Sequence, residues 1–206
     1  MDPEVKQDTD TSGQFELTSA RFGALPVVNH FLDRAGLPEL LDRYLPVRDA
    51  RVHLPAGAAI RLVVTNLLLG RSPLYALGEW AAPYAPGLLG LTATELSGVN
   101  DDRVARALDE VFDADRGSLL TELMLAVIAE FGIDTSELHN DSTSITLHGA
   151  HTGADGSPVR GKPTAAAAHG HSKDHRPDLK QLVWILTVAA DGAVGDHLPP
   201  RRRQHQ

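Results

Sequence analysis

The stretch SELHNDSTSITLH, residues 136–148, marks a change in the character of the chain. Its residues Asp141, Thr143 and Ile145 alternate with Ser and Thr, and this period of two is typical of a β-strand. A second stretch, QLVWILTVAA at 181–190, is a continuous apolar run of strand length. Such a run predicts a strand buried on both faces.

The residues before this change, 20–132, carry apolar side chains at helical spacing and show no strand signal. The segment 56–69 is apolar nearly all round, which predicts a central buried helix. Its expected core positions are Ile60, Val63, Val64, Leu67 and Leu68. Asn100 is suited to cap a helix, and Gly132 to end one.

These patterns predict an α+β protein: an all-helical N-terminal domain at 20–133 and a region with strands at 134–193. Residues 1–19 are acidic and polar and predict a disordered tail. The final stretch, 194–206, reaches two prolines and three consecutive arginines instead of a returning apolar strand. It predicts an unstructured tail.

The charge is unevenly distributed along the chain. The 206 residues hold 27 Asp and Glu against 19 Lys and Arg, a formal charge of −8. Residues 139–206 hold 8 basic against 6 acidic residues, together with 8 of the 10 histidines. The acidic balance excludes a protein that is basic throughout and binds nucleic acid along its whole length. Residues 139–206 are the part suited to bind an anion.

Composition excludes several other classes of protein. The chain has no cysteine, which excludes a disulfide scaffold, a zinc ribbon and a cysteine nucleophile. The sequence shows neither a targeting segment nor an apolar run long enough to span a bilayer. We therefore expect a soluble cytoplasmic protein without a membrane partner.

Two segments could carry chemistry. Asp141 lies within a predicted strand, where a carboxylate can bind Mg²⁺. The alternative is an aspartate that faces water at a sheet edge or caps a nearby loop. The segment HGHSKDHRPDLKQ, 169–181, is dense in donors that suit phosphate. It can also be a solvated loop, or a metal site using His169, His171 and His175, although their spacing matches no standard zinc pattern.

The segments LHNDSTSITLHGAH and GHSKDHRPDLKQLVWILTVAADG together resemble insertion-sequence transposases of the DDE class. More narrowly, the chain resembles the branch in which a helical domain precedes an RNase H-like catalytic core. The resemblance covers roughly residues 20–193. It implies that the strand at 181–190 lies beside the strand that carries Asp141 and antiparallel to it, as in the opening hairpin of an RNase H-like core. It implies strand cleavage and transfer at transposon DNA ends, with two Mg²⁺ held by three carboxylates.

The resemblance also assigns residues. Asp141 corresponds to the first of the three acids, so it is the expected catalytic and metal-binding residue. Expected DNA contacts near the core are Lys173, His175, Arg176 and Lys180. The remaining acids of the chain match neither of the other two catalytic positions. We therefore expect an incomplete RNase H-like α/β core, a truncated or frameshifted copy that is inactive by itself.

Alternatives from other classes stay open at this point. The helical domain can be a noncatalytic module that binds DNA, or that binds an intact transposase as an inhibitor. An incomplete sheet would leave an apolar edge, which predicts self-association into homo-oligomers. An unrelated His/Asp metalloprotein is the third interpretation.

Overall fold

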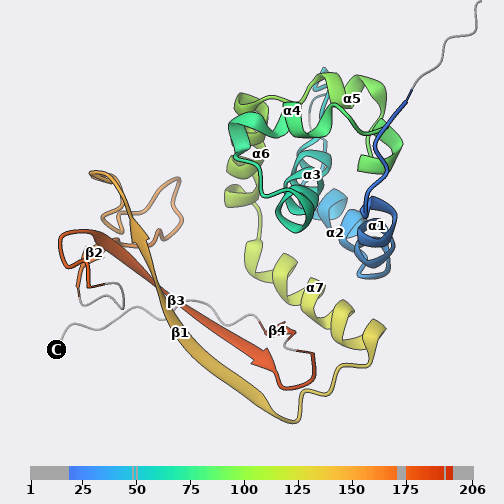
Figure 1. Ribbon diagram of the computed structural model, residues 1–206. Helices are drawn as coiled ribbons and strands as arrows, with labels where there is room; N and C mark the ends of the chain where they lie inside the picture. Colours follow the sequence, from blue (N-terminus) through green and yellow to red (C-terminus); the bar gives the residue numbers. More distant parts are fainter. Residues whose placement is uncertain (1–18, 48, 50, 171–174, 193, 197–206) are drawn as a thin grey trace, which may run out of the picture.

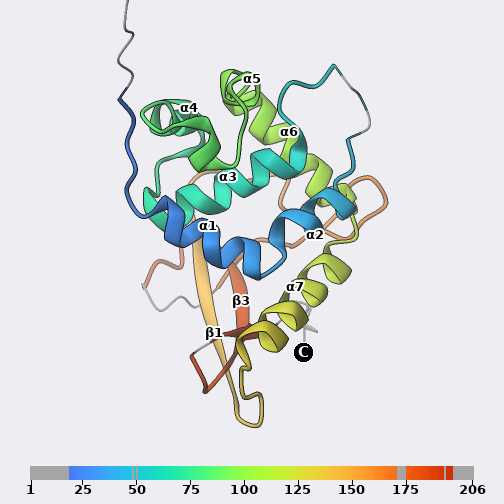
Figure 2. The same ribbon diagram turned by 90° about the vertical axis from the view of Figure 1, so that its right-hand side faces the viewer.

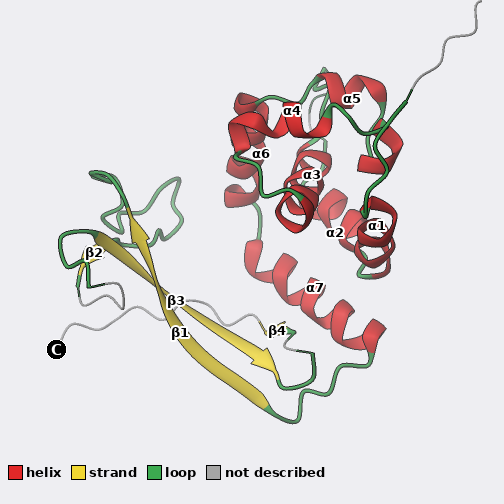
Figure 3. Cartoon of the chain, viewed as in Figure 1, coloured by secondary structure: helices red, strands yellow, loops and turns green. Residues whose placement is uncertain are grey.

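The structure is a computed structural model that describes residues 19–47, 49, 51–170, 175–192 and 194–196. Helices occupy the chain as far as Phe131, and strands follow from Leu138 (Figures 1 and 3). The predicted α+β class is confirmed. The predicted N-terminal tail lies outside the described residues except for Ser19.

The helical region contains helices of very different length. Its α-helices are α1 (Leu25–Arg34), α2 (Leu37–Tyr44), α3 (Ala56–Leu69), α4 (Leu77–Ala81), α5 (Ala93–Ser97), α6 (Asp101–Asp113) and α7 (Arg116–Phe131). Two 3₁₀ turns, Leu74–Ala76 and Pro86–Leu89, lie before and after α4. Helix α7 runs along the side of the bundle that faces the strands (Figures 1 and 2).

Local side-chain chemistry accounts for the ends of the last two helices. The Asn100 side chain accepts a hydrogen bond from Arg103 N at 2.8 Å and so begins α6. Asp115 caps α7 in the same way, accepting from Ser118 N at 3.1 Å. Gly132 ends α7 with φ of +63°, the left-handed conformation that glycine adopts most easily. Both predicted helix ends are confirmed.

The hydrophobic core belongs to the helical region. Its buried members come from α1, α2, α3, α4, α6 and the segments that connect them: Leu25, Leu37, Leu41, Leu45, Leu54, Ala56, Ala59, Leu62, Val63, Leu77, Ala81, Leu89, Leu91, Val104 and Ala107. Leu62, at the middle of α3, is 0% exposed. The helical region therefore has a core of its own, independent of the strands.

Helix α3 is central, but only part of its surface is buried. Val63 is in the core, and Ile60 and Val64 pack against it, as predicted. Leu67 and Leu68 are 57% and 59% exposed, so their predicted place in the core was wrong. An apolar pattern that runs around the whole helix cannot tell which side the neighbouring helices cover.

Two polar residues of α3 take the buried positions instead. Asn66 donates to Ser72 O at 2.8 Å and accepts from Ser72 N at 3.1 Å, so both ends of its amide are satisfied. Thr65 donates its hydroxyl to Arg61 O at 2.9 Å. Because these side chains bind the backbone, they are buried without leaving an unpaired polar group.

The strands form a twisted ribbon that projects from the helical bundle (Figures 1 and 2). Strand β1 (Leu138–Leu147) pairs antiparallel with β3 (Lys180–Ala189) along its whole length, from Leu138–Ala189 to Leu147–Lys180. This confirms the predicted antiparallel pairing. Strands β2 (Ala168–His169) and β4 (Gly195–Asp196) pair with the other edge of β3, near its two ends.

Two predictions about the strands were wrong. The side chains of Val183, Trp184 and Leu186 are about half exposed, so β3 is not buried on both faces. The reason is that the ribbon stands away from the helices, which leaves the middle of β3 in contact with solvent. Strand β4 also lies within the tail that was expected to be unstructured from 194; residues 197–206 lie outside the described residues.

Among the described residues, none of the helices combines the length and apolar character that crossing a membrane requires.

Candidate functional site

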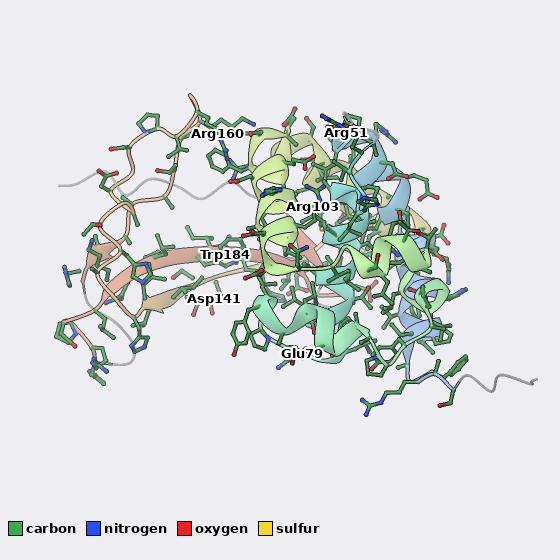
Figure 4. All side chains as sticks on the ribbon, turned by 90° about the horizontal axis from the view of Figure 1, so that it is seen from above. Arg51, Glu79, Arg103, Asp141, Arg160 and Trp184 are labelled. Carbon is green, nitrogen blue, oxygen red and sulfur yellow. The ribbon has the colours of Figure 1, made fainter. Side chains whose placement is uncertain are left out.

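Asp141 lies near the middle of β1, on the exposed surface of the ribbon (Figure 4). It stands directly opposite Leu186 of β3, and its diagonal neighbours on that face are Trp184 and Val188. The Asp141 carboxylate accepts a hydrogen bond from the backbone N–H of Ser142 at 2.7 Å. The predicted catalytic residue is therefore an accessible carboxylate with apolar neighbours across the strand pair.

Asp141 and Lys180 share one face of the ribbon but lie far apart. Lys180 pairs with Leu147, six residues along β1 from Asp141, which corresponds to about 20 Å. The Lys180 ammonium donates to His151 O at 3.0 Å, at the end of the ribbon. The structure therefore does not bring this expected DNA contact next to the expected catalytic residue.

The other described residues of the basic block lie at the same distal end. Arg176 forms a two-point ion pair with Asp178, with Nε–Oδ1 at 2.8 Å and Nη2–Oδ2 at 2.7 Å. This hydrogen-bonded pair lowers the pKa of Asp178 to about 2. His175 is exposed, with a positive φ of 54°. Lys173 lies outside the described residues.

The described residues do not fit a two-magnesium centre. Mg²⁺ requires several oxygen ligands, and the side chains across from Asp141, Leu186 and Trp184, offer none. Within the described parts of the chain, no group of three or more His, Asp or Glu side chains could hold a metal ion.

The helical region contains a cavity of about 220 Å³ between the α2–α3 connection and α6. Arg103 lines it, but its guanidinium already donates to Leu54 O at 2.7 Å and to Glu110 Oε1 at 3.0 Å. The bond to Leu54 O ties α6 to the chain before α3, whereas the bond to Glu110 lies within α6. Arg103 and Glu110 are therefore occupied in structural contacts within this cavity.

Sequence reasoning missed Arg160 and Lys162, which join the two parts of the molecule. Both lie in the glycine-rich connection after β1, and both contact α6. Figure 4 shows Arg160 reaching α6 from this connection. A signal for the contact was present in the sequence: Asp109 and Asp113 stand one helical turn apart and form an acidic pair on one face of α6.

Residues 17–125 of the 206 match a sequence family described as a domain of unknown function, DUF4277. The chain belongs to the DUF4277 family. The DUF4277 match spans α1 to α6 and the first part of α7, and it ends before β1. The candidate residues of the strands therefore lie outside the DUF4277 region. Searches of curated proteins and of solved structures gave no match to the chain.

Proposed function

We propose that the chain is part of an insertion-sequence DDE transposase, with residues 138–196 forming the opening strands of an RNase H-like core. The observation that carries this proposal is the antiparallel pairing of β1 with β3, with Asp141 within the first strand. It agrees with the hairpin that the resemblance implies.

In this proposal Asp141 is the first catalytic carboxylate. Among the described residues, it belongs to no group of three or more His, Asp or Glu side chains that could hold a metal ion. Cleavage of a phosphodiester by this class needs cations held jointly by several carboxylates. We therefore expect this polypeptide alone to bind the DNA ends of its element without cleaving them. Of the expected phosphate contacts, His175, Arg176 and Lys180 lie among the described residues.

The test uses the purified chain and a fluorescent duplex that carries one end of the surrounding element. We expect this duplex to bind more tightly than a scrambled duplex of equal length, with affinity falling as salt rises. Equal affinity for the two duplexes would contradict end recognition. A matched pair of variants, Lys180→Gln and Arg71→Gln, separates a contact at the ribbon from the loss of any one surface charge.

Cleavage of the same duplex with Mg²⁺ or Mn²⁺ forms the second arm of the test. We expect no cleavage by the chain, and no difference in the variant Asp141→Asn. Metal-dependent cleavage that Asp141→Asn abolishes would show that the site is complete in some way that the described residues do not reveal. The role of Asp141 itself is tested in a full-length relative with the same HNDST segment, where Asp→Asn should abolish transposition.

A second candidate is a noncatalytic module that binds an intact transposase as an inhibitor. The observation that favours it is the core of the helical region, whose buried cluster runs from Leu25 to Ala107 without any residue of the strands. Coexpression with an active relative tests this candidate. Reduced transposition by residues 19–133 alone would favour it, and an unchanged frequency would contradict it.

The ribbon supports self-association as a further property of the polypeptide. On the outer edge of β3, residues 182–186 lie between the short partners β2 and β4, with no strand paired to them there among the described residues. Open strand edges tend to pair with other chains. Light scattering of the purified chain should show oligomers at high concentration, and a monodisperse monomer would contradict this.

A further inference from the structure

The connection between β1 and β2 contains a tight turn at Val159–Lys162. Val159 N donates to Lys162 O at 3.0 Å, and Lys162 N donates to Val159 O at 2.9 Å. The two central residues, Arg160 and Gly161, have φ of +48° and +75°. Positive φ at both positions is the geometry of a type I′ hairpin turn. Arginine adopts this conformation rarely, so contacts outside the turn must help to hold it there.

Those contacts come from the C-terminal half of α6. The Arg160 guanidinium binds two carboxylates, with Nε at 2.8 Å from Asp113 Oδ1 and Nη2 at 3.0 Å from Asp109 Oδ1. Both carboxylates raise the pKa of Arg160, first through the hydrogen bond that its guanidinium donates to Asp109. One arginine therefore bridges two acids that stand one turn apart on the helix.

Lys162 binds the end of the same helix in a different way. Its ammonium donates to Asp113 O at 2.5 Å and to Ala114 O at 2.6 Å. The last carbonyl groups of a helix have no partner within the helix, and the negative end of the helix dipole attracts a cation. Lys162 thus acts as a C-terminal cap that is supplied by a distant part of the chain.

Phe112 completes the contact between the turn and the helix. The guanidinium carbon of Arg160 lies 5.2 Å from the centre of the Phe112 ring, and that of Arg116 lies 4.6 Å from it. Cations at this distance are attracted to an aromatic ring. The turn therefore has charged, capping and aromatic contacts with α6.

The contact is also open to water. The side chains of Arg160, Asp109 and Asp113 are 46%, 64% and 48% exposed. Ion pairs with this exposure are screened by salt and exchange readily with solvent. The contact therefore joins defined groups, but it can break and form again as the salt concentration changes.

We propose that the turn Val159–Lys162 is an ionic clamp that fixes the connection after β1 to α6 and releases it when ionic strength rises. Its two sides belong to the DUF4277 region and to the region that follows it. The clamp therefore controls how firmly the strand that carries Asp141 is held to the helical domain. This inference rests on the contacts of the turn and does not depend on the proposed function.

Limited trypsin digestion reads the state of the clamp directly. Trypsin cuts after Arg160, which Gly161 follows, whereas Pro163 blocks the cut after Lys162. Mass spectrometry then follows the appearance of fragments that begin at Gly161. In dilute buffer we expect slow cleavage at this bond, because a protease requires an extended and accessible segment.

The variants open the clamp from either side and leave the tryptic bond intact. Both Asp109→Asn/Asp113→Asn and Lys162→Gln should speed cleavage after Arg160 by roughly 3- to 30-fold. The control Asp101→Asn/Asp102→Asn removes the same charge from the other end of α6 and should leave the rate unchanged. Far-UV circular dichroism verifies that each variant is folded.

Salt provides the final comparison. Raising NaCl to about 0.5 M should speed cleavage of the wild-type chain and have little further effect on Asp109→Asn/Asp113→Asn, since its ion pairs are already lost. Cleavage after Arg160 that is insensitive to salt and to both clamp variants would overturn the proposal. Wild-type cleavage in dilute buffer as fast as that of a free peptide of residues 155–166 would also overturn it.

Discussion

Gly70 lies so close to the indole of Trp80 that a Cβ atom at position 70 would come 2.3 Å from Trp80 Nε1. The end of α3 therefore packs against α4 through the contact between Gly70 and the Trp80 indole. Trp80 packs against the core, and its ring also contacts Tyr84, with the ring centres 5.5 Å apart. The ring has little freedom to move away.

Replacing Gly70 with alanine should therefore destabilise the helical region by about 1–3 kcal/mol, the usual cost of overpacking. Urea unfolding followed by tryptophan fluorescence measures the change. Gly87→Ala is the matched control, because nothing lies within 4 Å of a Cβ atom at that position. That control should be neutral or stabilising by up to about 1 kcal/mol. Equal effects of the two substitutions would contradict the contact.

Leucines of α3 should differ sharply according to the face they occupy. Leu62→Ala removes a fully buried side chain and should lower the free energy of unfolding by about 2–5 kcal/mol. Leu67→Ala, at a position that is 57% exposed, should change it by no more than about 0.5 kcal/mol. Chemical denaturation of the two variants under the same conditions checks the order, and a larger loss for Leu67→Ala would refute it.

Asn66 should contribute to stability, because its buried side chain makes two hydrogen bonds with the backbone of Ser72. Asn66→Ala leaves both the N–H and the C=O of Ser72 without this partner, which should cost about 2 kcal/mol. Thr65→Val, the matched control, removes only the hydroxyl bond to Arg61 O and should cost less than about 1 kcal/mol. Thermal unfolding by circular dichroism ranks the two, and the reverse order would count against this role of Asn66.

The ion pair at the end of the ribbon should show itself in acid titration. Arg176 holds the pKa of Asp178 at about 2, below the ordinary aspartate value of 3.8. A lowered pKa means that the ionised form is favoured by folding. The contribution of this group to stability is thus fully present above about pH 4 and is lost as pH falls toward 2.

Carboxyl ¹³C NMR of the chain and of Arg176→Gln checks this sign. The variant should raise the pKa of Asp178 toward the ordinary value. Asp155 is the internal control, because its pKa is lowered by hydrogen bonds from Ser157 and should stay low in the variant. A pKa of Asp178 that Arg176→Gln leaves unchanged would show that another group is responsible.

The sequence predicted those features that depend on local chemistry. The helix caps at Asn100 and Gly132 follow from backbone groups that a nearby side chain or a glycine can satisfy. The alternation around Asp141 predicted β1, and the antiparallel pairing with β3 followed from the resemblance. The helical block was likewise visible from apolar spacing alone.

The features that the sequence did not predict depend on packing between distant segments. The exposure of Leu67 is set by where the other helices lie, which the apolar pattern of α3 does not contain. The contacts of Arg160 join residues 51 apart: the sequence shows the acidic pair on α6, but not which distant cation binds it. The predicted roles of Asp141 and of the basic block in catalysis and DNA contact stay predictions.

The clamp also bears on the order in which the chain folds. Strands β1 and β3 can pair only after the long run from His148 to Leu179 closes on itself, and closing a longer loop costs more entropy. The turn Val159–Lys162, bound to α6, fixes this segment near its middle. One long loop is thereby divided into two shorter loops. We expect helices to form first and the ribbon to assemble on them. Pulsed hydrogen exchange during refolding would then protect α6 before β3, and Asp109→Asn/Asp113→Asn would delay β3 alone.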